Sequence, residues 1–152
     1  MAGDIIGRMR EITGDIWEWL GKAVIVITTN GYVAKNGLAV LGRGCASQAK
    51  LRFPDLPQRL GRIIASSGNH VASLGDGIVS FPVEDSPWAL PEFHIIRRSA
   101  SELRHMADRE GWETVVVPRP GCGGGGLVWD QVRPLLDEHF DDRFYIITAE
   151  DR

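Results

Sequence analysis

The sequence has too few cysteines for a disulfide-stabilised fold and no excess of positive charge. Its 152 residues include only Cys45 and Cys122, and the formal net charge is −3. Both cysteines stand beside glycines, and such sparse use suits a reducing compartment. The charge does not provide the basic surface of a duplex-binding domain. A nucleic acid recognised through one modified nucleotide stays open, because that requires a pocket.

The chain also lacks the marks of a secreted or membrane protein. Its first residues, MAGDIIGRMREI, have neither the basic start nor the continuous apolar stretch of a signal peptide. No apolar window is long enough to cross a bilayer. No repeat, low-complexity linker or change in composition marks a second domain. We therefore expect one cytoplasmic domain over residues 1–152, with no membrane partner.

Metal-binding patterns are missing as well. The four histidines, His70, His94, His105 and His139, show no H-x-x-x-H or similar ligand spacing. We expect neither a metal nor another cofactor.

Short apolar runs rich in β-branched residues alternate with segments of helical spacing. Such runs are typical of strands buried on both faces. The expected strands are residues 9–13, 23–28, 78–81, 114–117 and 144–148. The expected helices are residues 45–53, 56–65, 92–110 and 129–140, with Gly111 as a stop signal and Pro134 as a possible kink. This alternation predicts an α/β fold, a three-layer α/β/α sandwich with a mixed, mostly parallel central sheet.

The strongest chemical signal is VVVPRPGCGGGGLVWDQV, residues 115–132. An apolar strand leads into six residues, Gly121–Gly126, of which five are glycine, and then into an amphipathic helix. Free amides in such a loop, together with the positive end of the helix, form an anion site. Each glycine costs about 0.5–1 kcal/mol of backbone entropy within ordered structure, so an ordered loop requires compensating contacts.

Three familiar interpretations of this loop fail. A Walker A loop requires Gly-Lys-Ser/Thr, but Leu127 and Val128 follow the last glycine. The GxGxxG match is followed by only 26 residues, without the further strand ending in an acidic residue that a dinucleotide fold requires. A cysteine-phosphatase loop would need an arginine six positions after Cys122, where Val128 stands.

A second glycine-containing loop lies between residues 28 and 50. It follows an apolar strand and leads into a helix through Leu41-Gly42-Arg43-Gly44-Cys45-Ala46. At about 15 residues it is longer than an ordinary connection, and long loops are often functional. Loops at the carboxyl ends of parallel strands face one crevice, so a diphosphate could lie between the two.

Taken in order, four segments resemble the macro domain family, whose members recognise ADP-ribose. Ile12–Ile16 (ITGDI) is similar to the family's first-strand motif, and Ile25–Asn30 to its second strand. Leu41–Ala46 resembles the first ligand loop, and Pro118–Trp129 the diphosphate loop. The resemblance extends over nearly the whole chain. Within the family it favours the branch of terminal ADP-ribose–protein glycohydrolases and the antitoxins that remove ADP-ribose from DNA.

The resemblance implies a role for each candidate ligand-binding residue. Asp15 would accept the exocyclic amine of adenine, with Ile16 beside it, although a helix N-cap is the alternative for Asp15. Asn30 would lie near the distal ribose. The remaining candidates would surround the distal ribose and the diphosphate: Gly42, Arg43, Gly44, Cys45, Gly121, Cys122, Gly123, Gly124, Gly125, Gly126 and Leu127. The implied partner is ADP-ribose or an ADP-ribosylated macromolecule, with nucleic acid only as an ADP-ribosylated substrate.

Two departures concern catalysis. The branch places a lysine in a motif similar to F-P-x-K, where this chain has Glu84, and some members place an aspartate where Gly125 stands. A lysine can form a Schiff base and a glutamate cannot. Glu84 could instead be a solvated surface carboxylate beside Asp85.

Three functions therefore remain open. The first is an ADP-ribose binder with weak or altered catalysis. The second is an ADP-ribosyl hydrolase or ADP-ribose 1″-phosphate phosphatase in which Glu84 or Asn30 orients a water. The third is a binder of another nucleotide.

Overall fold

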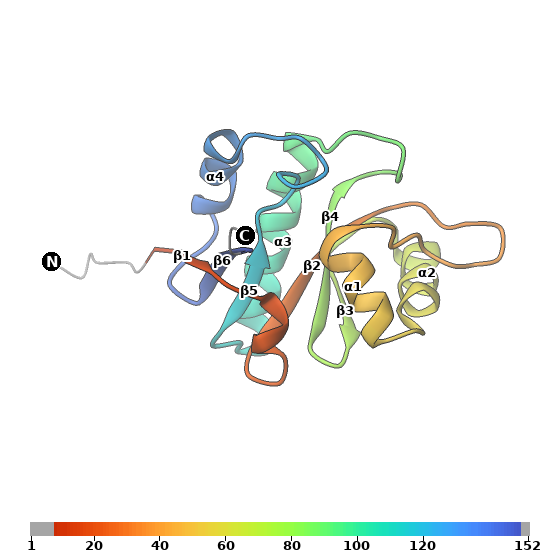
Figure 1. Cartoon of the computed structure of the whole chain (residues 1–152), viewed down its shortest axis with the longest axis horizontal. Coiled ribbons are helices and arrows are strands. Elements are labelled where there is room, and N and C mark those ends of the chain that lie inside the picture. The colour runs from red at the N-terminus through yellow and green to blue at the C-terminus, as the bar shows by residue number, and fades with distance from the viewer. Residues whose placement is uncertain (1–7, 150–152) are drawn as a thin grey trace, which may run out of the picture.

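The computed structural model describes residues 8–149, in which a six-stranded sheet lies between two pairs of helices (Figure 1). The strand order is β1-β6-β5-β2-β4-β3, and every neighbouring pair is parallel except β3 with β4. The strands are β1 (Arg10–Thr13), β2 (Val24–Asn30), β3 (Ala72–Gly75), β4 (Ile78–Glu84), β5 (Val115–Pro118) and β6 (Phe144–Thr148).

The helices divide between the two faces of the sheet. On one face lie α1 (Gly44–Arg52), α2 (Leu56–Ser67) and a 3-10 turn, η2 (Ile16–Trp19). On the other lie α3 (Phe93–Glu110) and α4 (Trp129–Asp137). The expected three-layer sandwich with a mixed, mostly parallel sheet is confirmed.

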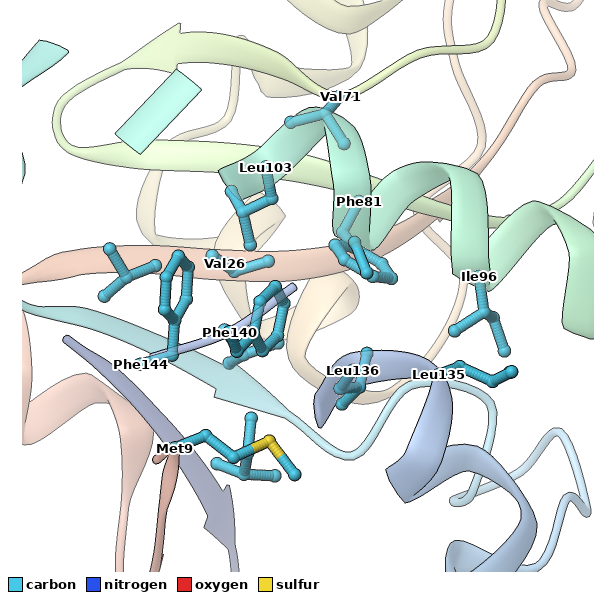
Figure 2. Close-up of a cluster of buried hydrophobic side chains, with 14 of the residues drawn as sticks. Met9, Val26, Val71, Phe81, Ile96, Leu103, Leu135, Leu136, Phe140 and Phe144 are labelled. Atoms are coloured by element: carbon cyan, nitrogen blue, oxygen red, sulfur yellow. The ribbon is translucent and has the colours of Figure 1, made fainter. Parts of the chain in front are cut away.

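Each face of the sheet carries its own apolar core. In the core beneath α3 and α4, Phe140 stacks on Phe144 with ring centroids 4.1 Å apart. Figure 2 shows both side chains within this cluster. Val26 and Phe81 project into the same cluster from β2 and β4. Both faces are covered, so the strands are continuous apolar runs, as expected for buried parallel strands.

All of the expected strands and helices are present, and two short elements occur in addition. The helix expected over 129–140 ends at Asp137, where the chain tightens and the His139 amide donates to the Leu136 carbonyl at 2.9 Å. The helix expected over 92–110 ends as predicted, with Gly111 in the left-handed conformation (φ 70°). Strand β3 and the turn η2 were not expected, because four-residue elements leave little periodicity in a sequence.

The largest difference is at β4, which continues beyond Phe81 to Glu84. The expected strand was the apolar run 78–81, which stops before Pro82. A proline removes a ladder hydrogen bond from a strand. The pairing of β2 with β4 shifts register here: Thr29 faces Pro82, and Asn30 faces Glu84. A bulge of this kind accommodates a proline and turns the following side chain. Glu84 is thereby carried by the sheet and does not lie in a loop.

Candidate functional site

Five strand ends gather at one edge of the sheet because β1, β6, β5, β2 and β4 are all parallel. A cleft of about 1080 Å³ follows this edge over the ends of β1, β6 and β5. A separate cavity of about 210 Å³ lies over the ends of β2 and β4. Such an edge is where open α/β sheets bind ligands.

The cleft has the size of a cofactor site. Seven of the residues predicted from the sequence line it: Asp15, Ile16, Gly44, Cys45, Cys122, Gly123 and Leu127. Four more predicted residues line the small cavity: Asn30, Gly42, Arg43 and Glu84.

Asp15 combines the two interpretations that the sequence left open. Its Oδ1 accepts the Trp17 amide at 2.9 Å, so it caps the turn η2. It also lines the cleft beside Ile16, which is buried. One carboxylate oxygen of Asp15 therefore caps η2, and the other oxygen of this exposed carboxylate can contact a ligand in the cleft.

The glycine-rich loop folds on itself through three backbone hydrogen bonds. The Leu127 amide donates to the Gly121 carbonyl at 2.9 Å, the Gly126 amide to Gly123 at 3.3 Å, and the Cys122 amide to Arg119 at 3.3 Å. Within residues 8–149, the amides of residues 123, 124 and 125 donate to no backbone carbonyl. Successive free amides of this kind can bind an anion. Gly123 lines the cleft, whereas Gly124 and Gly125 line neither the cleft nor the small cavity.

Two helices begin beside this loop without side-chain caps. The N-cap of α1 is Arg43 and that of α4 is Val128, and neither side chain accepts a backbone hydrogen bond. The first turn of α4 carries Asp130, whereas the first turn of α1 carries no acidic residue, so the positive end of the α1 dipole is the one without a compensating side chain. A helix end of this kind favours an anionic ligand.

Glu11 on β1 holds both ends of the loop. Its Oε1 accepts the Trp129 indole N–H at 3.0 Å and lies 3.6 Å from Nη2 of Arg119. Its Oε2 lies 3.2 Å from Nε of Arg133. Arg119 also lies over the Trp129 ring, 4.9 Å from the centroid. The sequence carried no signal for this contact, because Glu11 and Trp129 are 118 positions apart.

We expect Glu11→Ala to weaken binding of an anionic ligand at the loop about tenfold, since a charged hydrogen bond contributes about 1.5–3 kcal/mol. Hydrogen exchange of the Gly121–Gly126 amides should become faster at the same time. The matched control is Glu110→Ala, which removes an exposed ion pair to Arg109 of 3.2 Å. Unchanged exchange in the Glu11 variant would contradict this role.

Glu84 is a buried carboxyl in the small cavity, which corrects the interpretation as a solvated surface group. Its exposed fraction is 7%, and Oε2 has no hydrogen-bond partner among the described residues. Burial raises the pKa of this carboxyl, and attraction to the Arg43 guanidinium opposes the rise. An unpartnered carboxyl inside a cavity is suited to accept hydrogen bonds from a ligand.

Asn30 faces the same cavity, but its amide is already engaged. Its Nδ2 donates to the Val40 carbonyl at 3.1 Å, and its Oδ1 accepts the Tyr32 amide at 3.0 Å. Thr29, which also lines the cavity, has a buried hydroxyl without a partner among the described residues. Besides the Arg43 side chain, the cavity therefore offers one carboxyl and one hydroxyl that have no partner among the described residues.

Arg43 lies between the two spaces. It lines the small cavity, and its neighbour Gly44 lines the cleft. Its side chain crosses to the glycine-rich loop, so that a Cβ atom added to Gly124 would lie 3.4 Å from its Cδ and Nη1. The guanidinium is thus placed beside the loop amides, where a phosphate would lie, and its charge also acts on Glu84.

The two cysteines belong to the cleft wall and have no activated thiolate. Burial raises the pKa of the Cys45 thiol, and hydrogen bonding from Thr28 opposes this only in part. Burial also raises the pKa of Cys122. A raised pKa disfavours the nucleophilic thiolate. Among residues 8–149 no three His, Cys, Asp or Glu side chains gather as a metal site, and no helix could span a bilayer.

The fold is that of the macrodomains. No protein-family model matches the chain. The macrodomain of Thermus aquaticus DarG superposes with a TM-score of 0.75, at 21% identity, covering 95% of this chain and 99% of that one. The expected resemblance to macro domains is confirmed.

Two further comparisons concern proteins of Thermosipho africanus. A solved structure described as Thermosipho africanus DarTG in complex with ADP-ribose gives a TM-score of 0.73 at 20% identity, covering 97% of this chain and 44% of that one. A DNA ADP-ribosyl transferase–DNA ADP-ribosyl glycohydrolase fusion protein from the same species is 26% identical over 129 residues. The alignment covers 68% of this chain, which spans about a third (33%) of the fusion protein.

Proposed function

We propose that this protein binds ADP-ribose, either free or as the terminal group on a macromolecule, with weak or altered catalysis. The observation that carries the proposal is the divided site. A wide cleft lies on one side, lined by Gly123 of the glycine-rich loop, and a small polar cavity lies on the other, and Arg43 extends from the cavity wall to that loop. ADP-ribose has the matching plan, with an adenosine and a ribose joined by a diphosphate. The ADP-ribose in the Thermosipho structure supports the same ligand class.

Each part of the ligand has a place. The adenine would lie at Asp15 and Ile16, where the second carboxylate oxygen can accept its amine. The diphosphate would lie between the amides of residues 123–125 and the start of α1, beside Arg43. The distal ribose would enter the small cavity, where the Glu84 carboxyl can accept hydrogen bonds from its hydroxyls.

The macromolecular target we propose is ADP-ribosylated DNA. The fusion protein to which the chain is similar carries a DNA ADP-ribosyl glycohydrolase by name. In this chain the lysine of the related branch is replaced by Glu84, which cannot form a Schiff base. The protein would therefore hold the modified strand and release ADP-ribose slowly or not at all.

One observation favours slow hydrolysis as a second candidate. Glu84 is buried and unpartnered, and its pKa is raised, which are the properties of a general base that could activate a water. In such a reaction the activated water would attack the anomeric carbon directly, without a covalent enzyme intermediate.

Calorimetry with ADP-ribose tests the proposal. We expect a dissociation constant below about 100 μM, corresponding to at least ~5.5 kcal/mol, and weaker binding of ADP, NAD and ATP. Asp15→Asn keeps the helix cap but exchanges a carboxylate oxygen for an N–H donor, so it should lower affinity about tenfold without lowering the unfolding temperature. No heat at high micromolar ADP-ribose, or stronger binding of ATP, would overturn the proposal.

A further inference from the structure

We infer that Tyr32 and Trp88 form a stacking surface for the nucleobase to which the ADP-ribose is attached. This rests on the proposed function and goes beyond it, because it assigns residues that hold the target rather than the ADP-ribose. Neither side chain lines the cleft or the small cavity.

The two rings form a fixed pair. Their centroids are 4.7 Å apart and their planes are inclined by 75°, an edge-to-face arrangement that aromatic rings prefer. Trp88 nevertheless remains 74% exposed. A large aromatic ring that is held in place and left open to solvent has a free face on which a planar group can lie.

The pair stands beside the small cavity. Pro87, which precedes Trp88, lines that cavity. Tyr32 is tied to the cavity wall on the other strand, because its amide donates to Oδ1 of Asn30 at 3.0 Å. The tips of β2 and β4 thus bring the two rings together where a group leaving the cavity would emerge.

The chemistry of the attached group favours a nucleobase. With the distal ribose in the cavity, a group bonded to its anomeric carbon must emerge within a few ångströms. A nucleobase would present a planar π-face there directly, whereas an ADP-ribosylated amino acid would present a flexible, mostly non-aromatic side chain. Stacking on exposed tryptophan and tyrosine is the usual way in which unpaired bases are held.

The charges near the pair are compatible with a nucleic acid strand. Lys35 follows Tyr32 in the same exposed loop, and Arg43 is exposed at the neighbouring edge of the cavity. The nearest carboxylate in the sequence, Asp85, accepts a hydrogen bond from Nδ2 of Asn69 at 3.2 Å. One modified nucleotide held by stacking needs no broad basic surface, which agrees with the net charge of −3.

The test compares Trp88→Ala with the wild type on two ligands, free ADP-ribose and a single-stranded oligonucleotide with one ADP-ribosylated base. We expect the variant to bind free ADP-ribose within about twofold of wild type, and to bind the oligonucleotide about 5- to 100-fold more weakly. Trp88→Phe should restore most of the loss. The control is Leu90→Ala, which truncates a side chain in the same segment that is 77% exposed.

The outcomes separate the two proposals. If the wild type fails to bind ADP-ribose, the proposed function fails. If it binds ADP-ribose but Trp88→Ala holds the oligonucleotide as tightly as wild type, the stacking surface is wrong. An equal loss of affinity for an ADP-ribosylated peptide would also overturn it, because the surface would then not be reading a base.

Discussion

The Gly125→Ala variant is expected to lose ADP-ribose binding by at least about 100-fold, or ~2.7 kcal/mol. A Cβ atom at this position would lie 2.7 Å from the Gly121 carbonyl oxygen and 2.6 Å from Cγ of the buried Pro91. Both distances are shorter than real side chains allow. The Gly121 carbonyl also accepts the Leu127 amide, so relief of the overlap must open the loop. Calorimetry measures the loss.

Gly123→Ala is the matched control for the fold of the same loop. A Cβ atom there meets nothing within 4 Å, and the backbone is not in the left-handed region. This variant should retain the wild-type unfolding temperature and the hydrogen-exchange pattern of the loop, whereas Gly125→Ala should change the exchange pattern. Binding by Gly125→Ala within threefold of wild type would mean that the anion does not lie on these amides.

The Glu84→Lys variant is expected to release ADP-ribose from an ADP-ribosylated oligonucleotide at least about 100-fold faster than wild type, a difference of ~2.7 kcal/mol in the barrier. The cavity that buries Glu84 would lower the pKa of the introduced amine, as would the neighbouring Arg43, and a neutral amine is a nucleophile. The amine would attack the anomeric carbon, and the bond to the target would break as the leaving atom gains a proton. Water would then release ADP-ribose and regenerate the amine.

Chromatography of free ADP-ribose and of the unmodified oligonucleotide follows this reaction. Glu84→Arg introduces a cation without a nucleophile and should stay as slow as wild type or slower. Glu84→Gln tests the slower reaction, in which the Glu84 carboxyl activates a water. The amide keeps the shape of the side chain but cannot act as a general base. Wild-type release as fast as that of Glu84→Lys would show that the carboxyl itself is an effective catalyst.

The sequence predicted the fold well because its strongest signals were local. Continuous β-branched runs located the buried strands, and Gly111 located the end of α3. The order of the loops at strand ends was enough to predict one shared edge, since parallel strands bring their carboxyl ends together. Of the predicted loop residues, Gly42, Arg43, Gly44, Cys45, Cys122, Gly123 and Leu127 line the two spaces at that edge, whereas Gly121, Gly124, Gly125 and Gly126 line neither.

The features that could not be predicted from the sequence depend on contacts between segments that are far apart in the chain. The sequence around Glu84 indicated an exposed charge, because no local pattern reveals the bulge that lets β4 continue past Pro82. The contacts of Glu11 with Trp129 and Arg133 exist only once β1 lies beside the start of α4. The T-shaped pairing of Tyr32 with Trp88 likewise depends on two strand tips that are neighbours only in the folded sheet.

The arginine that crosses to Gly124 also bears on how the fold could be re-engineered. Its side chain lines the small cavity and reaches the glycine-rich loop, whose Gly123 lines the cleft. We expect that exchange for a short residue would join the small cavity and the cleft into one continuous trough. Such a trough would accept ligands branched at the pyrophosphate or at the second sugar, which makes this single position the natural starting point for fluorescent or immobilised capture reagents.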